Sequence, residues 1–288
     1  MKFKDFSLCE ETLRSLLEMG FEEPTPIQVS AIPLVLKGKD IIGQAQTGTG
    51  KTAAFGIPIV EKCKRGKNPY AVILEPTREL AVQVSQEILR IGRYKKLRVL
   101  PVYGGASLER QVKALRGGVD ILVATPGRII DHINRNTLSL SDIKIVVLDE
   151  ADEMLNMGFI EDIETILNAT PSERQTLLFS ATMPLPIINI AKRYMKNPEK
   201  VKINTKEIVV PEIKQIFYEV REEDKLNTLS KLLDVEDPKL AIVFCHTKRE
   251  VDDVSMKLGQ MGYSAGALHG DYTQTLVKKI VSGYRIWN

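Results

Sequence analysis

The chain has few cysteines, few aromatic residues and no long apolar run, and each shortage excludes a class of protein. Its three cysteines, Cys9, Cys63 and Cys245, lie far apart and include no Cys-x-x-Cys pair, so neither a disulfide framework nor a zinc site is expected. No apolar stretch approaches the ~20 residues of a membrane span, and the opening residues do not resemble a signal peptide. We therefore expect a cytoplasmic protein without a membrane segment.

A large excess of charge is also missing. The net charge is +3 over 288 residues, which by itself is too small to indicate a polyanionic partner. Aromatic residues make up 6% of the chain, and none interleaves the polar segments described below, so stacking platforms for single-stranded bases are not expected. The length suggests about two domains of roughly 150 residues each.

The chain does contain a glycine-rich segment after an apolar strand predicted at 40–43. This segment reads Ala45, Gln46, Thr47, Gly48, Thr49, Gly50, Lys51 and Thr52. Glycines let successive backbone N–H groups point at a polyphosphate, while Lys51 can reach phosphate oxygens and the Thr52 hydroxyl suits Mg²⁺. The usual pattern has glycine at the position of Ala45, whose small methyl group still lets the loop bind phosphate in this way. An ordinary loop is the alternative.

An acidic segment follows a second apolar run at 145–148. It comprises Asp149, Glu150 and Asp152 around Ala151, and its carboxylates can hold a metal ion and polarise a water molecule. Together, the glycine-rich and acidic segments predict a nucleotide triphosphatase.

The alternation of apolar runs and amphipathic stretches predicts an α/β fold. Helices are clearest after Thr77 and near 158–168, and Pro33 and Pro58 should kink or stop the helices that contain them. Continuous apolar strands between such helices indicate a parallel sheet covered on both faces. The expected strands are 41–44, 71–74, 98–103, 120–124, 144–148, 176–180 and 200–203.

A second strand–helix series follows a connector at 206–212. It has strands expected at 216–220, at 240–244 and before Asp271, with helices around 225–233 and 249–258. This order resembles the first half of another α/β domain.

Six polar segments of the first domain each follow an apolar strand, at the sheet edge where parallel α/β folds bind ligands. Two of them carry an arginine in the opening turn of a helix, namely Arg78 after Thr77, and Arg128 after Thr125 and Pro126. Such helix starts bind phosphate readily, and Gly104-Gly105 would let a sugar–phosphate backbone approach closely. Ordinary helix caps are the alternative reading.

These segments resemble, in order and spacing, the motif series of DEAD-box ATP-dependent RNA helicases. The resemblance covers about residues 3–275 and rests on 20–28, 45–52, 76–80, 104–105, 125–128, 149–152 and 180–182. It implies a RecA-like domain that binds ATP and RNA, followed by a second RecA-like domain that closes over both.

The resemblance also assigns roles to single residues. Phe3 would pack on adenine and Gln28 would read its edge, with core packing and a surface role as the respective alternatives. Residues 45–52 would hold ATP, with Thr52 and, through water, Asp149 at Mg²⁺. Catalysis would involve Lys51, Asp149, Glu150, Asp152, Ser180 and Thr182. Backbone contacts to RNA, with little sequence specificity, would come from Pro76, Thr77, Arg78, Gly104, Gly105, Thr125, Pro126, Gly127 and Arg128.

The resemblance weakens near the C-terminus, where Gln274 is followed three residues later by Val277 instead of an arginine. We therefore expect a complete domain at 1–206 with a Q motif at about 1–29, a linker at 207–213 and a partial RecA-like domain at 214–288. The implied activity is ATP hydrolysis coupled to RNA binding and local unwinding, impaired in this chain. An ATP-gated RNA-binding module without turnover and a small-molecule kinase are the competing interpretations. The oligomeric state is not indicated.

Overall fold

The computed structural model describes residues 1–203, 214, 216–272, 276–277 and 280. It divides into two compact units, Met1–Val209 (unit 1) and Val210–Asn288 (unit 2). The predicted linker 207–213 and the departure at Gln274 lie outside the described residues.

Unit 1 is built on a parallel seven-stranded sheet in the order β3-β4-β2-β5-β6-β1-β7. Every strand predicted for this unit is confirmed within one or two residues. The strands are β1 (Ile41–Gln44), β2 (Ala71–Leu74), β3 (Val99–Val102), β4 (Ile121–Ala124), β5 (Ile145–Leu148), β6 (Gln175–Ser180) and β7 (Glu199–Lys202).

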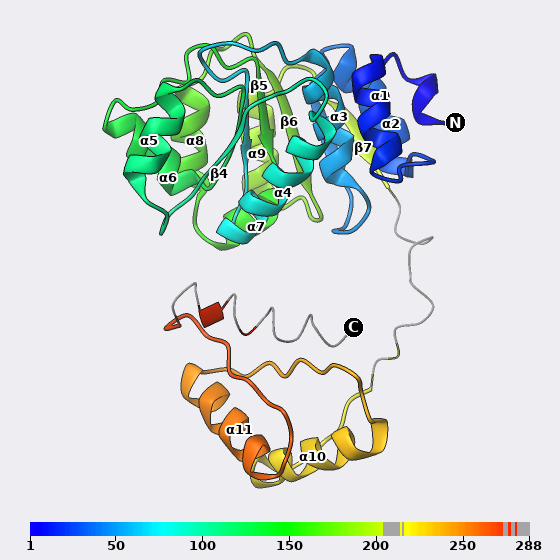
Figure 1. The fold of residues 1–288 in the computed structure, drawn as a ribbon, viewed down its shortest axis with the longest axis vertical. Helices are drawn as coiled ribbons and strands as arrows, with labels where there is room; N and C mark the ends of the chain where they lie inside the picture. The colour runs from blue at the N-terminus through cyan, green and yellow to red at the C-terminus, as the bar shows by residue number, and fades with distance from the viewer. Residues whose placement is uncertain (204–213, 215, 273–275, 278–279, 281–288) are drawn as a thin grey trace. The chain divides into compact units, whose positions relative to one another are not determined.

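Helices cover both faces of this sheet (Figure 1). Successive strand residues point to opposite faces, so Ile73 joins one buried cluster while Val72 and Leu74 join the other. The first cluster is covered by η1 (Phe3–Asp5), α1 (Glu10–Glu18), α2 (Pro26–Leu36), α3 (Lys51–Lys62) and α4 (Arg78–Ile91). The second is covered by α5 (Leu108–Arg116), α6 (Pro126–Asn134), α7 (Ala151–Asn156), α8 (Ile160–Asn168) and α9 (Leu185–Tyr194).

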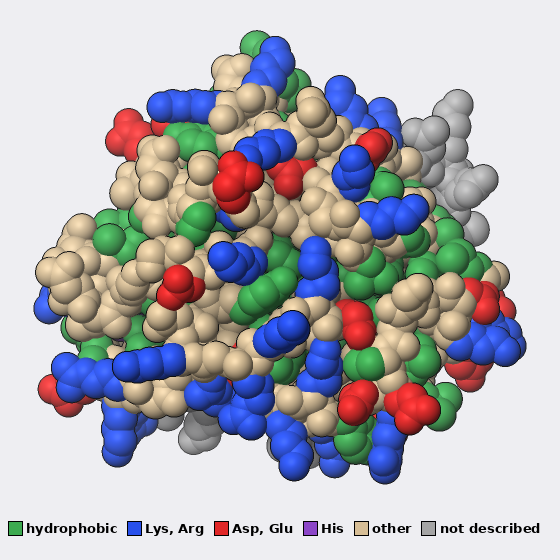
Figure 2. Space-filling view, turned by 90° about the horizontal axis from the view of Figure 1, so that it is seen from above, with side chains coloured by type: hydrophobic (Ala, Val, Ile, Leu, Met, Phe, Trp, Pro, Cys, Tyr) green, Lys and Arg blue, Asp and Glu red, His purple; other side chains and the backbone are tan. Residues whose placement is uncertain are grey.

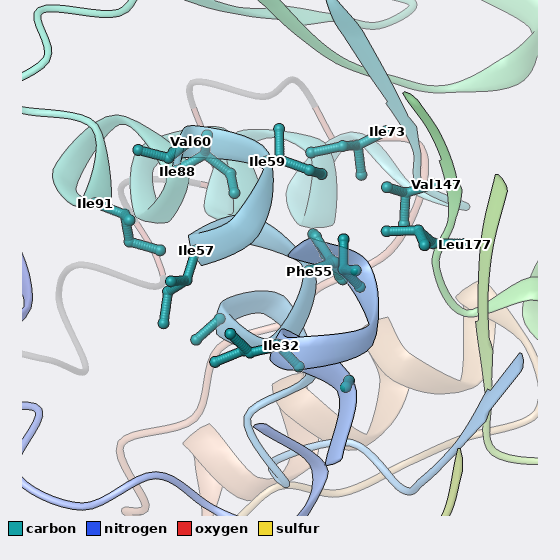
Figure 3. Packing of buried hydrophobic residues seen from close by; sticks show 14 of the residues in the cluster. Ile32, Phe55, Ile57, Ile59, Val60, Ile73, Ile88, Ile91, Val147 and Leu177 are labelled. Carbon is teal, nitrogen blue, oxygen red and sulfur yellow. The ribbon is translucent and has the colours of Figure 1, made fainter. Parts of the chain in front are cut away.

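Helices α3 and α4 pack closely against each other in the first cluster. At Gly56 an added Cβ would lie 2.5 Å from Ile88 Cδ1, so glycine permits this approach. Figure 3 shows Ile57, Val60 and Ile88 from the two helices in the same apolar cluster.

Pro33 and Pro58 were predicted to kink or stop their helices, and the prediction of a stop is wrong. Both prolines lie inside continuous helices, α2 and α3. Each removes one backbone donor, yet the hydrogen bonds beyond it persist, from Lys37 N to Pro33 O and from Cys63 N to Ile59 O. Burial of both helices against the sheet outweighs the local cost of each proline.

Unit 2 confirms the two predicted helices but not the predicted strands. Its described elements are η3 (Glu222–Asp224), α10 (Lys225–Glu236) and α11 (Lys248–Gln260). The segments 216–220, 240–244 and 267–269 form no strand, and Phe217 and Phe244 are 89% and 92% exposed. Strands require partners for their backbone hydrogen bonds, and none is available among the described residues of this unit.

Candidate functional site

The strand order separates the predicted site residues into two neighbouring halves of one sheet edge. The ends of β3, β4 and β2 carry Gly104-Gly105, 125–128 and 76–78. We call these three segments the arginine half. The ends of β5, β6 and β1 carry 149–152, 180–182 and 45–52. We call these the phosphate-loop half.

The glycine-rich segment leads directly into α3, which begins at Lys51. Gly48 and Gly50 both have positive φ angles, of 80° and 88°, which glycine adopts without strain. An added Cβ at Gly50 would also lie 2.5 Å from Gln28 Nε2, whereas nothing lies within 4 Å at Gly48. Gly50 is therefore required by its backbone conformation, and a Cβ there would also displace the Gln28 amide that donates to Gly50 O.

Lys51 connects the glycine-rich segment to the acidic segment. Its Nζ donates to Glu150 Oε1 at 2.8 Å and lies 4.0 Å from Asp149 Oδ1. The side chains of Lys51 and Glu150 are only 5% and 14% exposed, so this ion pair is poorly screened by solvent. Residues 99 positions apart in the sequence thus form one charged cluster.

Two carboxyl groups beside this cluster are strongly perturbed. Burial, together with the charge of Glu150, raises the pKa of Asp149 to about 7, although Lys51 opposes the shift. Glu75, which follows β2 and was not predicted, is fully buried, and burial with the charges of Asp149 and Glu150 raises its pKa well above the ordinary value. Neither Glu75 oxygen has a hydrogen-bond partner among the described residues. Such perturbed groups are typical of functional sites.

The backbone at Glu150 is strained. This residue caps α7 in the left-handed conformation, with φ 47° and ψ 49°, which costs a non-glycine residue about 1–3 kcal/mol. The conformation turns the chain between β5 and α7, so that Glu150 faces Lys51.

Asp152 links the acidic segment to the end of β6. Its Oδ2 accepts from Thr182 N and from Thr182 Oγ1, both at 2.8 Å, and its backbone N–H donates to Ser180 Oγ. Burial favours a higher pKa for Asp152, but side-chain hydrogen bonds from Ser180 and Thr182 outweigh it and lower the pKa. The carboxylate is therefore charged and fixed in place.

Gln28 and Phe3, which precede the glycine-rich segment in the sequence, differ in their contacts with it. Gln28 is buried, and its amide accepts from Thr25 N and donates to Gly50 O at 3.1 Å, which rules out the surface role weighed above. Phe3 packs against the rings of Phe6 and Phe21 in the core cluster, the packing role weighed as its alternative.

The arginine half converges on the loop after β3. Thr77 caps α4 through Leu80 N, and Arg78 NH1 lies 3.0 Å from the position of a Cβ at Gly105. Arg128 NH1 donates to Ala106 O at 3.2 Å. Thr125 is the N-cap of α6 and Pro126 its first residue, as predicted, although the Thr125 side chain makes no capping hydrogen bond. Two arginines thus flank the Gly104-Gly105 loop.

Figure 2 shows lysine and arginine side chains spread over one side of the molecule among acidic, polar and apolar ones. Within the described residues all three cysteines are free, no group of three or more His, Cys, Asp or Glu side chains could hold a metal ion, and no helix is long and apolar enough to cross a membrane.

Comparison with known proteins places these features in a family. A family model described as DEAD/DEAH box helicase matches residues 25–190. The chain is 57% identical over 273 residues to the DEAD-box ATP-dependent RNA helicase CshA of Bacillus licheniformis, covering 94% of this chain and 56% of that protein. It is 58% identical to CshA of Geobacillus kaustophilus, covering 94% and 58%. The chain thus spans little more than half the length of these relatives.

A solved structure agrees with this assignment. The crystal structure of a DEAD box protein from the hyperthermophile Methanococcus jannaschii is similar, with a TM-score of 0.70 and 43% sequence identity. The match covers 99% of this chain and 77% of that one.

Proposed function

Because this chain belongs to the DEAD/DEAH-box helicase family, we propose that it binds ATP at the phosphate-loop half, hydrolyses it at an impaired rate, and couples this reaction to RNA binding at the arginine half. The relatives that are named ATP-dependent RNA helicases support this proposal. The observation that carries it is the 2.8 Å contact between Lys51 Nζ and Glu150 Oε1, which unites the phosphate loop and the acidic segment in one buried cluster.

The contacts of these residues support specific roles in phosphoryl transfer to water. Lys51 would leave Glu150 to bind β- and γ-phosphate oxygens, and the released Glu150 carboxylate would orient the attacking water and take its proton. Asp152, Ser180 and Thr182 would relay changes at this site toward β6 and RNA binding. Positioning and electrostatics supply most of the acceleration in such reactions.

The donor set fits Mg²⁺. Thr52 follows Lys51 in the first turn of α3, and Lys51 Nζ reaches to 4.0 Å from Asp149 Oδ1, so the side chain before Thr52 already contacts the acidic segment. Both supply oxygen atoms, which Mg²⁺ prefers. Thr52 would bind the ion directly and Asp149 through water, and the ion would neutralise phosphate charge.

The arginine half supports backbone recognition of RNA. Arg78 and Arg128 flank a glycine loop that a sugar–phosphate backbone can approach. Gly104 and Gly105 carry no side chain for base stacking, and the nearest aromatic residue in the sequence is Tyr103, directly before them. We expect binding with little sequence preference and strong salt dependence, because phosphate contacts release counterions.

Phosphate release tests the proposed function. Release from ATP should rise on addition of RNA, exceed release from GTP because Gln28 favours adenine, and fall sharply in Lys51→Ala. Glu153→Gln, an exposed change in the same helix as Asp152, is the matched control and should behave as the parent. Release that ignores both RNA and Lys51→Ala would contradict the proposal.

A further inference from the structure

A buried glutamine holds both sides of the Gly104-Gly105 loop. Gln111 of α5 is 5% exposed, and its Nε2 donates to Tyr103 O at 3.1 Å. Its Oε1 accepts from Arg128 NH1 at 3.2 Å, and the same NH1 donates to Ala106 O. One amide and one guanidinium therefore fix the backbone immediately before and after the two glycines.

His132 fixes the orientation of this amide. Its Nε2 lies 2.9 Å from Gln111 Oε1, and its Nδ1 lies 2.7 Å from Thr137 Oγ1. Because Gln111 Oε1 can only accept, His132 Nε2 carries the proton, and Nδ1 and the backbone O of His132, at 2.7 and 3.1 Å, share the single proton of the Thr137 hydroxyl. A flipped amide would place its oxygen against Tyr103 O and its NH₂ group against Arg128, so the network has one arrangement.

The two central members of this chain of hydrogen bonds, Gln111 and His132, are buried. Thr137 donates to His132, and His132 and Arg128 both donate to Gln111, which donates to Tyr103 O. The Arg128 side chain is 14% exposed, compared with 44% for Arg78. Arg78 is thus the more available of the two arginines, while Arg128 is engaged in holding the loop.

We propose that Gln111, supported by His132 and Thr137, is a positioning residue for RNA binding, which holds the Gly104-Gly105 loop in the shape that admits an RNA backbone. This inference rests on the proposed function, since it concerns the same arginine half. Gln111 carries no charge and is buried, so it acts on RNA through the loop. Buried polar groups that hydrogen-bond to one another in this way rigidify the local structure.

Salt dependence of RNA affinity distinguishes positioning from phosphate contact. We would measure binding of a fluorescent single-stranded RNA by anisotropy across a salt series, using the full chain. Gln111→Ala should lower affinity about tenfold, the effect of losing roughly two buried hydrogen bonds, with the log–log salt slope unchanged. Arg78→Ala should also reduce that slope by about one, because it removes a phosphate contact. Gln86→Ala, an exposed neutral change on α4, should match the parent.

A milder variant keeps the test decisive if Gln111→Ala fails to fold. Thr137→Val removes the hydroxyl that donates to His132 and should lower affinity about threefold, again with the parental slope. Parental affinity in the folded variants, or a slope change as large as that of Arg78→Ala, would overturn the inference and leave the proposed function standing. Absence of salt-dependent RNA binding by the parent would overturn both.

Discussion

Replacing Glu150 with glutamine should have opposite effects on the stability of the free protein and on its affinity for ATP. Glu150 accepts a charged hydrogen bond from Lys51 at 2.8 Å, in a pair whose side chains are 5% and 14% exposed. A triphosphate must displace this bond to reach Lys51. Glutamine keeps the shape of the side chain and weakens the bond that competes with the phosphates.

The magnitude follows from the burial of the pair. A hydrogen bond to a charged group contributes about 1.5–3 kcal/mol and a neutral one about 1 kcal/mol; since Lys51 keeps its charge, the loss of the ionised acceptor removes at most this difference, about 0.5–2 kcal/mol. Glu150→Gln should therefore unfold at a lower temperature without nucleotide yet bind ATP·Mg²⁺ roughly 2–30-fold more tightly. Hydrolysis should fall by about 10²–10⁴, because the group that activates water is lost.

Isothermal titration of ATP·Mg²⁺ and thermal unfolding, run on the same preparations, measure both effects. Glu153→Gln removes the same charge from an exposed position three residues away and should leave both quantities within error of the parent. Unchanged or weaker ATP binding by Glu150→Gln would refute the idea that Glu150 competes with phosphate for Lys51.

Three further substitutions test separate parts of the account. Gly50→Ala should destabilise the fold and weaken ATP binding more than Gly48→Ala. Both glycines have positive φ angles, but only at Gly50 would an added Cβ lie 2.5 Å from Gln28. Thermal unfolding and ATP titration measure both effects, and equal effects of the two substitutions would contradict this reasoning. Asp149 has a pKa of about 7 in the folded protein, against an ordinary value of 3.8. Between these two pH values the folded state therefore binds more protons than the unfolded state. The free energy of unfolding should fall as the pH rises from about 4 to 7 and then level off. Urea unfolding of Asp149→Asn across that pH range should show a shallower fall in the free energy of unfolding than the parent. An identical pH profile would exclude Asp149 as the group responsible. Asp120 is buried and accepts from Arg98 Nη2 at 2.7 Å, although the Arg98 side chain is 33% exposed, and it also accepts from the backbone N–H groups of Gly66 and Arg98. Asp120→Ala should therefore lower the free energy of unfolding in urea by about 1–3 kcal/mol, because these donors lose their acceptor. The exposed Asp142→Ala should change it little, and equal losses would show that the contacts of Asp120 are unimportant.

Most strands of unit 1 were predictable because they are short apolar runs, and β2, β4 and β5 are buried on both faces, whereas the edge strand β7 has a single buried residue, Val201. The run at 145–148, for example, is completely buried in β5. Parallel strands also place their carboxyl ends on one edge, so the location of the six polar segments followed from the sequence. The order of the strands in the sheet did not follow from the sequence, because apolar runs of similar composition can pair with one another in many orders. The division into a phosphate-loop half and an arginine half therefore required the structure.

Other features depend on contacts that a single sequence does not display. Glu75 is a single polar residue at the end of an apolar run, and only the pairing of β2 with β5 brings it beside Asp149. Gln111 belongs to none of the motifs, and its role depends on Tyr103, Arg128 and His132 meeting around it. In unit 2 the apolar pattern predicted strands at 216–220 and 240–244, but pairing decides whether a strand forms.

Hydrogen exchange with separate ligands tests the central claim, that one sheet edge binds nucleotide on one half and RNA on the other. The non-hydrolysable analogue of ATP with Mg²⁺ should slow amide exchange in 45–52 and 149–152, because backbone N–H groups there would face phosphates and the metal site. Single-stranded RNA should slow exchange in 76–80, 104–107 and 125–128. Protection of the same segments by both ligands, or RNA protection confined to 45–52, would contradict the division of the edge and the function assigned to each half.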